Sequence, residues 1–101
     1  MNFEELDMRV LAWAKERGIL LASNPEKQAL KMVSEVGELC DAIAVRDRAQ
    51  IVDGMGDTVV TLIILAELLN LDLTECLESA YNVIADRKGK LVDGIFVKEE
   101  E

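Results

Sequence analysis

The chain of 101 residues contains no histidine, a single proline and few aromatic side chains (4%). The lack of histidine excludes a histidine general base, a histidine-ligated zinc site and a carboxylate–histidine di-iron centre. With 50% hydrophobic residues and little proline or glycine, the composition is neither disordered nor loop-rich. Because aromatic residues are scarce while Leu, Val, Ile, Ala and Glu are common, the sequence favours helices over a β-sandwich.

Basic residues are outnumbered 11 to 20 by acidic ones, which gives a net charge of −9. Such a chain repels the backbones of DNA and RNA, so nucleic-acid polymers are not expected as partners. It also repels a small polyphosphate unless divalent cations come between the two. The longest uncharged apolar run, residues 58–66, is nine residues long, whereas a membrane span needs about 20. We therefore expect no contact with a membrane.

The two cysteines, Cys40 and Cys76, are far apart in the sequence and form no C-x-x-C pattern. Each is flanked by helix-forming residues. The sequence therefore predicts two buried thiols in the reducing environment of the cytoplasm.

Helix start and stop signals divide the chain into four helices and a tail. Asn24 is a natural N-cap with Pro25 at the first helical position, and Gly18 ends the preceding helix. Thr74 is the predicted cap of the last helix. The tail alternates weakly around residues 93–94, which predicts a small hairpin or an extended arm. The four helices are expected at about residues 3–18, 25–45, 50–70 and 75–87.

Two of these helices have marked apolar surfaces. The second half of the third helix, residues 58–69, is apolar on nearly every side and must be surrounded by protein, which so short a chain can hardly provide alone. We expect a homo-oligomer, either a dimer or a tetramer, with the tetramer slightly favoured. The predicted architecture is an all-α four-helix bundle completed by oligomerisation, in one domain over residues 1–101 with a core at 3–88 and a tail at 89–101. The apolar face of the second helix consists of Leu30, Val33, Val36, Leu39, Cys40 and Ile43.

Two acidic pairs lie on consecutive helices. Glu35 and Glu38 are three residues apart, and Asp53 and Asp57 are four apart, so each pair shares one helix face. Packed together, the two helices would set four carboxylates around one space, which is costly without a cation. Hard oxygen ligands select Mg²⁺, or Mn²⁺, over zinc and copper.

The acidic pairs also have a purely structural interpretation. The E-x-x-E spacing recurs at Glu75 and Glu78, where acids stabilise the first turn of the last helix. A solvated helix face is the corresponding alternative for Glu35 and Glu38. Three glycines near the carboxylates favour a site, because they let a backbone or a bulky ligand approach closely. These glycines are Gly37, Gly54 and Gly56.

The joint pattern resembles a known family. The segment PEKQALKMVSEVGELCDAI, followed by DGMGDTVVTLIIL, is similar to the MazG-like all-α nucleoside triphosphate pyrophosphohydrolases, relatives of dimeric dUTPases and dCTP pyrophosphatases. Their hallmark is E-x-x-E on one helix and E-x-x-D on the next. Glu35, Glu38 and Asp57 match this hallmark, while Gly54 stands where the remaining Glu is expected. Asp53, one residue earlier, is the expected substitute.

The resemblance implies a Mg²⁺-dependent hydrolysis of (deoxy)nucleoside triphosphates to the monophosphate and pyrophosphate, as a house-cleaning reaction of the nucleotide pool. It implies a metal held by Glu35, Glu38, Asp53 and Asp57, with Glu35 or Glu38 orienting or deprotonating the attacking water. Two alternatives remain open. One is a catalytically silent helical oligomer that acts as a binding or regulatory module, which Gly54 keeps open. The other is a phosphoribosyl-ATP pyrophosphohydrolase, which shares the scaffold.

Five further residues are candidates for substrate binding. The resemblance places the base pocket near Trp13 and Gln28, and Asn82 and Lys88 near the sugar or a phosphate. Lys31, one turn before Glu35, could reach a phosphate. Each basic or aromatic candidate also has a structural interpretation: core packing for Trp13, an ion pair with Glu35 for Lys31, and a helix C-terminus for Lys88.

Overall fold

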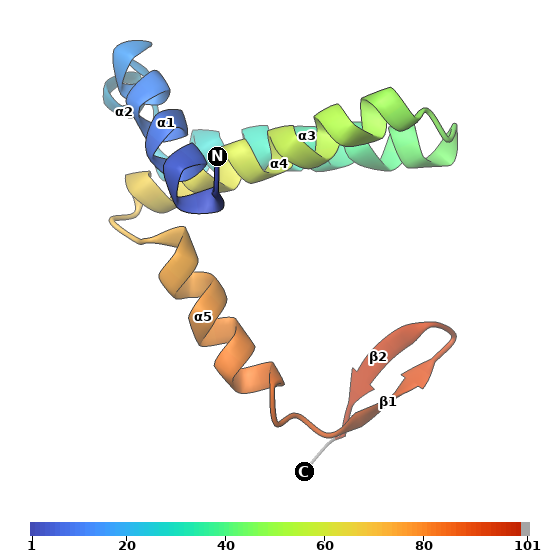
Figure 1. Cartoon of the computed structure of the whole chain (residues 1–101). Coiled ribbons are helices and arrows are strands. Elements are labelled where there is room, and N and C mark those ends of the chain that lie inside the picture. The colour runs from blue at the N-terminus through green and yellow to red at the C-terminus, as the bar shows by residue number, and fades with distance from the viewer. Residues whose placement is uncertain (100–101) are drawn as a thin grey trace.

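The computed structural model describes residues 1–99, and in this part of the chain five helices are followed by a β-hairpin (Figure 1). The predicted all-α class is confirmed, with one helix more than expected. No helix in residues 1–99 is both long and apolar enough to cross a membrane. The elements are α1 (Phe3–Glu16), α2 (Ile19–Ala22), α3 (Pro25–Ala44), α4 (Arg48–Leu68), α5 (Leu73–Ile84), β1 (Gly89–Val92) and β2 (Ile95–Lys98).

The first helix boundaries follow the predicted signals. The Asn2 side chain accepts a hydrogen bond from the Glu5 N–H at 2.9 Å and starts α1. Gly18 has a φ of 77°, a left-handed conformation that suits glycine, and it separates α1 from the short α2. Asn24 caps α3 by accepting from the Lys27 N–H at 2.8 Å. The four-residue α2 is too short to show an apolar period in the sequence.

The last helix begins earlier than predicted. Asp72, not Thr74, is its N-cap, and the Asp72 carboxylate accepts hydrogen bonds from the N–H groups of Thr74 and Glu75 at 2.8 and 3.3 Å. The predicted cap was therefore wrong. Both residues carry a suitable oxygen, and the carboxylate of Asp72 also complements the positive end of the helix dipole.

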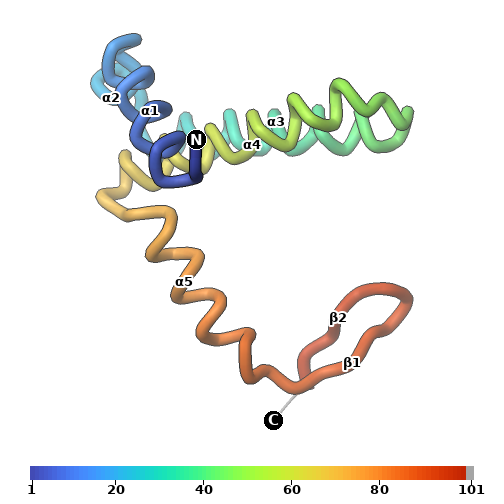
Figure 2. Tube along the Cα trace, in the orientation of Figure 1, coloured from blue at the N-terminus to red at the C-terminus, as the bar shows by residue number. Residues whose placement is uncertain are grey.

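The α3–α4 pair forms the most extensive contact in the described part of the chain, and the two helices lie side by side in Figures 1 and 2. Gln28 contacts Thr61 and Leu39 contacts Gly54, so residue numbers rise on one helix as they fall on the other, and the helices are antiparallel. Along each helix, the buried or half-buried residues that face the partner helix recur every three or four residues, as in a coiled coil. This α3–α4 seam consists of Gln28, Met32, Glu35, Leu39 and Ala42 on α3, and Gly54, Thr58, Thr61 and Leu65 on α4.

The predicted apolar face of α3 is divided by this seam. Leu39 lies in the seam, whereas Leu30, Val33 and Ile43 are 72%, 61% and 52% exposed. Cys40 is also exposed, as is Cys76 on α5, so the prediction of two buried thiols is wrong for the single chain. A helix can bury only one of its faces against a single neighbour. The seam uses the face of α3 that contains Met32, Leu39 and Ala42, so the rest of the predicted apolar face stays exposed.

The C-terminal part extends away from the helices before it, as the orange and red segments of Figures 1 and 2 show. Residues 73–98, which we name the arm, include α5, β1 and β2, none of which buries a residue. The predicted hairpin is confirmed: the strands are antiparallel and turn at Asp93 and Gly94, both with positive φ. The radius of gyration is 16.1 Å, whereas a compact chain of this length has about 13 Å.

Gly54 sets the distance between α3 and α4. A Cβ atom at this position would lie 3.2 Å from both the Cα and the Cβ of Leu39. We expect Gly54→Ala to lower the stability by about 1–3 kcal/mol relative to Gly37→Ala, because only the first forces the two backbones apart. Gly37 is the matched control, since a Cβ there meets no atom within 4 Å. Thermal or urea unfolding of both variants measures the difference, and equal stabilities would contradict this role of Gly54.

Candidate functional site

Glu35 lies in the middle of the α3–α4 seam and is only 7% exposed. One of its oxygens pairs with Lys31 Nζ at 3.0 Å across one helical turn. The other, Oε2, is buried and has no hydrogen-bond partner among residues 1–99. Thr58, the α4 residue opposite in the seam register, donates its hydroxyl to the Gly54 carbonyl at 2.8 Å instead. An unpaired buried carboxylate oxygen is costly, and a cation is its natural complement.

Glu38 follows one turn later, and the two carboxyl groups affect each other's ionisation. A protonated Glu38 can donate a hydrogen bond to Glu35, and this, together with the negative charge of Glu35, raises the pKa of Glu38. The pKa of Glu35 is lowered, first by its hydrogen bond with Lys31. The pKa of Lys31 is raised by Glu35 and, more weakly, by Glu38 and Asp57. Glu35 therefore holds its negative charge, and Glu38 takes up a proton more readily than an ordinary glutamate.

An open cleft of about 370 Å³ lies along one side of the seam, and we name it the acidic cleft. Antiparallel packing brings the polar flanks of α3 and α4 to the same side, so that Glu38, Asp53 and Asp57 of the predicted pairs line the cleft. Glu35, the fourth predicted carboxylate, lies in the seam and does not line it. The lining of the cleft has four carboxylates, one carboxamide and no basic residue. The residues that line it are Glu38, Asp41, Gln50, Asp53, Gly54 and Asp57.

The structure adds two residues that the sequence analysis missed, Asp41 and Gln50. Asp41 lies three residues after Glu38, so extending the E-x-x-E spacing by one step would have found it. Gln50 lies three residues before Asp53 in the same way. Gly54 lines the cleft with backbone alone, because its Cα faces Leu39.

The donor set suits a hard divalent cation, although the carboxylates are not drawn together. Within residues 1–99, no three His, Cys, Asp or Glu side chains are arranged as a ready metal site. Carboxylates repel one another without a cation, so a spread arrangement is what electrostatics favours. The unpaired Oε2 of Glu35 and the oxygen-only lining of the cleft both fit Mg²⁺ or Mn²⁺.

Trp13 and Gln28 do not line the acidic cleft. Gln28 is buried in the seam, where its Nε2 donates to the Thr61 carbonyl at 3.2 Å and links α3 to α4. Trp13 lies on α1, is 45% exposed, and has the Arg17 guanidinium 5.9 Å from its ring centroid. Within its own chain, Gln28 therefore acts as a packing residue.

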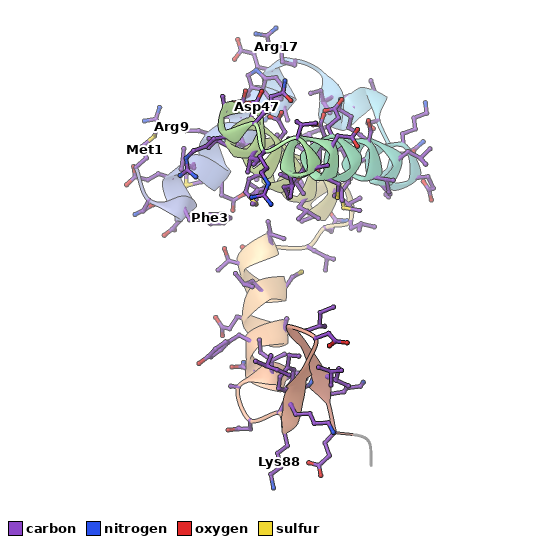
Figure 3. All side chains as sticks on the ribbon, turned by 90° about the vertical axis from the view of Figure 1, so that its right-hand side faces the viewer. Met1, Phe3, Arg9, Arg17, Asp47 and Lys88 are labelled. Carbon is purple, nitrogen blue, oxygen red and sulfur yellow. The ribbon has the colours of Figure 1, made fainter. Side chains whose placement is uncertain are left out.

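Asn82 and Lys88 belong to the arm and also lie outside the acidic cleft. Lys88 lines a separate hollow of about 370 Å³ on the hairpin, together with Lys90 and Lys98. Figure 3 shows Lys88 at the far end of the arm from Asp47, the cap of α4. A single chain thus keeps its predicted phosphate-binding lysine apart from its carboxylates.

Comparison with known proteins identifies the family and agrees with the fold. A family model described as the MazG nucleotide pyrophosphohydrolase domain matches residues 23–92. An uncharacterised 18.2 kDa protein from the rep-hol intergenic region of Haemophilus phage HP1 is 34% identical over 71 residues, which are 70% of this chain but only 44% of that protein. The fold resembles that of the cyanophage S-2L MazG-like pyrophosphohydrolase, solved with dGDP and three catalytic Mn²⁺ ions per active site. The TM-score is 0.77 at 24% identity, over 100% of this chain and 96% of the other.

Replacing Glu38 and replacing Glu35 should change the stability of the metal-free protein in opposite directions. The folded state raises the pKa of Glu38 above its ordinary 4.5, so ionised Glu38 costs stability at neutral pH, and the cost disappears as the pH falls below about 4.5. Glu38→Gln should therefore raise the melting temperature at pH 7. The lowered pKa of Glu35 contributes stability above about pH 4.5 that is lost on acidification, so Glu35→Gln should lower the melting temperature at pH 7. Thermal unfolding in EDTA at pH 7 and pH 4 checks both signs, and a shift in the same direction for both variants at pH 7 would contradict the coupling.

Proposed function

The chain belongs to the MazG nucleotide pyrophosphohydrolase family, and from this premise we propose that the acidic cleft hydrolyses nucleoside triphosphates. The reaction releases the nucleoside monophosphate and pyrophosphate and depends on a divalent cation, Mg²⁺ or Mn²⁺. Its role is the removal of unwanted nucleotides from the cellular pool. The similar fold of an enzyme solved with dGDP and Mn²⁺ supports this proposal.

The observation that carries the proposal is the buried Glu35 carboxylate, which has one oxygen without a partner among residues 1–99 and lies one helical turn before Glu38, a residue of the acidic cleft. A group that only solvated a helix surface would point to water. Glu35, Glu38, Asp53 and Asp57 would hold the cation, which supplies charge neutralisation of the triphosphate and activation of water.

The two glutamates are suited to different roles. Glu35 is held by Lys31 and stays ionised, so it serves as a fixed ligand. Glu38 is exposed at the cleft, and its raised pKa makes it the better acceptor for the proton of the attacking water. Lys31 positions Glu35 and adds a positive charge near the entering phosphates.

Gly54 does not argue for a silent module. Any side chain at this position meets Leu39, so the glycine is explained by helix packing. The cleft still contains Asp53, and it gains Asp41 from α3. The carboxylate count is thus preserved by neighbouring residues.

The activity test is pyrophosphate release from a panel of dNTPs, NTPs and phosphoribosyl-ATP, with Mg²⁺, Mn²⁺ or EDTA. We expect metal-dependent release of pyrophosphate from members of the panel. Glu38→Gln should lower the rate of release by about 100-fold or more, because a positioned base contributes about 10²–10⁴-fold. Glu78→Gln is the matched control, since Glu78 belongs to the second E-x-x-E and does not line the cleft. Circular dichroism should show unchanged helix content in both variants. Turnover in Glu38→Gln at the wild-type rate would contradict the assignment.

We also propose that the active form is a homo-oligomer, a dimer or a tetramer. The side of the α3–α4 pair opposite the acidic cleft is apolar and uncovered in one chain. Contiguous exposed apolar surface of this kind marks an association site. Its members include Val33, Val36, Ile43, Val52 and Met55, which are 39–61% exposed.

Light scattering should give a mass of at least twice 11.2 kDa. Val33→Glu should shift the protein to a smaller species, because it places a charge in the middle of the apolar side. A folded wild-type monomer of 11.2 kDa would contradict the proposed oligomer.

A further inference from the structure

The Lys31–Glu35 ion pair is the only one that forms within residues 1–99, although the chain contains 11 basic and 20 acidic side chains. Its two partners differ in their surroundings: the Glu35 side chain is 10% exposed, whereas that of Lys31 is 60% exposed. The carboxylate is therefore fixed in the α3–α4 seam, and the ammonium group reaches it from the solvent side. This is not an ordinary surface ion pair, because its acidic member has little access to water.

The pair is not explained by the stability of the helix. A glutamate four residues before a lysine stabilises a helix more than the reverse order, and α3 has the reverse order here. The lysine is not a packing residue either, since most of its side chain is exposed. What the pair provides is a positive charge for a carboxylate inside the seam, where an uncompensated charge is costly.

The Lys31 ammonium group lies near the carboxylates that are expected to hold the cation. It is 3.0 Å from one oxygen of Glu35, and the charges of Glu38 and Asp57 act on it as well, more weakly. These three carboxylates are the ones that match the E-x-x-E and E-x-x-D hallmark. No basic residue lines the acidic cleft. Lys31 is therefore the positive charge that the chain itself supplies to these carboxylates.

A lysine is an incomplete substitute for a divalent cation at this position. Its charge is paired with one oxygen of Glu35, while Oε2 has no partner among residues 1–99. A divalent cation carries twice the charge and takes about six oxygen ligands, so it competes well for the same carboxylate. Two cations on one carboxylate repel each other. The exposed, flexible side chain of Lys31 can turn away from Glu35 without disturbing a packed group.

We propose that Lys31 is the counter-ion of Glu35 in the metal-free chain, that it leaves Glu35 when a divalent cation binds there, and that it then binds a phosphate oxygen of the nucleotide. The same lysine thus keeps the buried carboxylate charged before the metal arrives and adds a phosphate contact afterwards. The phosphate contact rests on the proposed function, whereas the exchange of cations at Glu35 rests on the metal site alone.

Calorimetric titration of Mn²⁺ into the nucleotide-free protein tests the exchange. Lys31→Met keeps an unbranched side chain but removes the charge, so no competitor remains at Glu35. We expect this variant to bind Mn²⁺ about 10-fold more tightly than the wild type, the equivalent of one charge-assisted hydrogen bond. Lys27→Met is the matched control, because it removes the same charge from an exposed position one turn earlier on α3. Its affinity should change by less than about twofold, since a screened surface charge acts weakly. Unchanged or weaker Mn²⁺ binding in Lys31→Met would overturn the exchange.

Thermal unfolding gives a second readout that needs no activity. In EDTA, Lys31→Met should have a lower melting temperature than Lys27→Met, because Glu35 then keeps a buried charge without its partner. With saturating Mn²⁺ this difference should disappear, since the tighter binding of the cation offsets the loss of the lysine. A difference that persists at saturating Mn²⁺ would mean that Lys31 stays on Glu35 in the loaded protein, contrary to the proposal.

The kinetics of pyrophosphate release at saturating Mn²⁺ test the phosphate contact. Lys31→Met should raise the KM for the nucleotide about 10-fold and change kcat by less than about twofold, because a contact present throughout the bound states affects binding alone. Lys31→Arg keeps the charge and should restore the KM to near the wild-type value. A lower kcat with an unchanged KM would assign Lys31 to the positioning of Glu35 and would overturn the phosphate contact.

These measurements separate the exchange from the proposed function. A wild type without pyrophosphate release, whose Lys31→Met variant still binds Mn²⁺ more tightly, would remove the proposed function and keep the exchange. An active wild type with the same Mn²⁺ affinity as both methionine variants would overturn the exchange alone.

Discussion

The antiparallel contact between α3 and α4 is the constraint on which the rest of the structure depends. Because Gly54 lets α4 approach the backbone of Leu39, the two helices pack closely enough for a seam of three and four spacings to form. That seam buries Glu35 and turns the polar flanks of both helices to one side. The carboxylates thus lie on one side because of helix packing, and Gly54, where the resemblance leads us to expect a glutamate, is part of that packing.

The seam also carries polar groups at a cost to stability. The Gln28 amide donates to the Thr61 carbonyl and the Thr61 hydroxyl donates to the Thr58 carbonyl, but Oε2 of Glu35 has no partner among the described residues. A leucine at position 35 would pack the seam better and would remove the site. Proteins commonly accept reduced stability where a ligand or a reaction requires it, and Glu35 fits this pattern.

The sequence predicted most of the fold, and three of its four predicted carboxylates, Glu38, Asp53 and Asp57, lie along one cleft. Asn24-Pro25, Gly18 and Asp93-Gly94 mark their boundaries by backbone chemistry that acts locally, so these were predictable. The sequence did not show which apolar face of α3 packs within the chain, because Leu30 and Ile43 are as hydrophobic as Leu39 and only the register with α4 distinguishes them. Asp41 and Gln50 continue the three-residue spacing in the sequence, but only the packing of the two helices shows that they line the cleft. The place of Lys88 on the hairpin, outside the cleft, follows from the course of the arm and has no local signal in the sequence.

The arm has a consequence for how the chain folds. Helices α3 and α4 are joined by three residues, and their contacts form between segments close in the sequence, which favours rapid folding of a single molecule. The arm has no such local partners. In the proposed homo-oligomer its ordering becomes a bimolecular step, faster at higher protein concentration, and dilution would loosen the C-terminal quarter while the helix pair persists. The cellular abundance of the chain would then set how much of it is assembled at any moment.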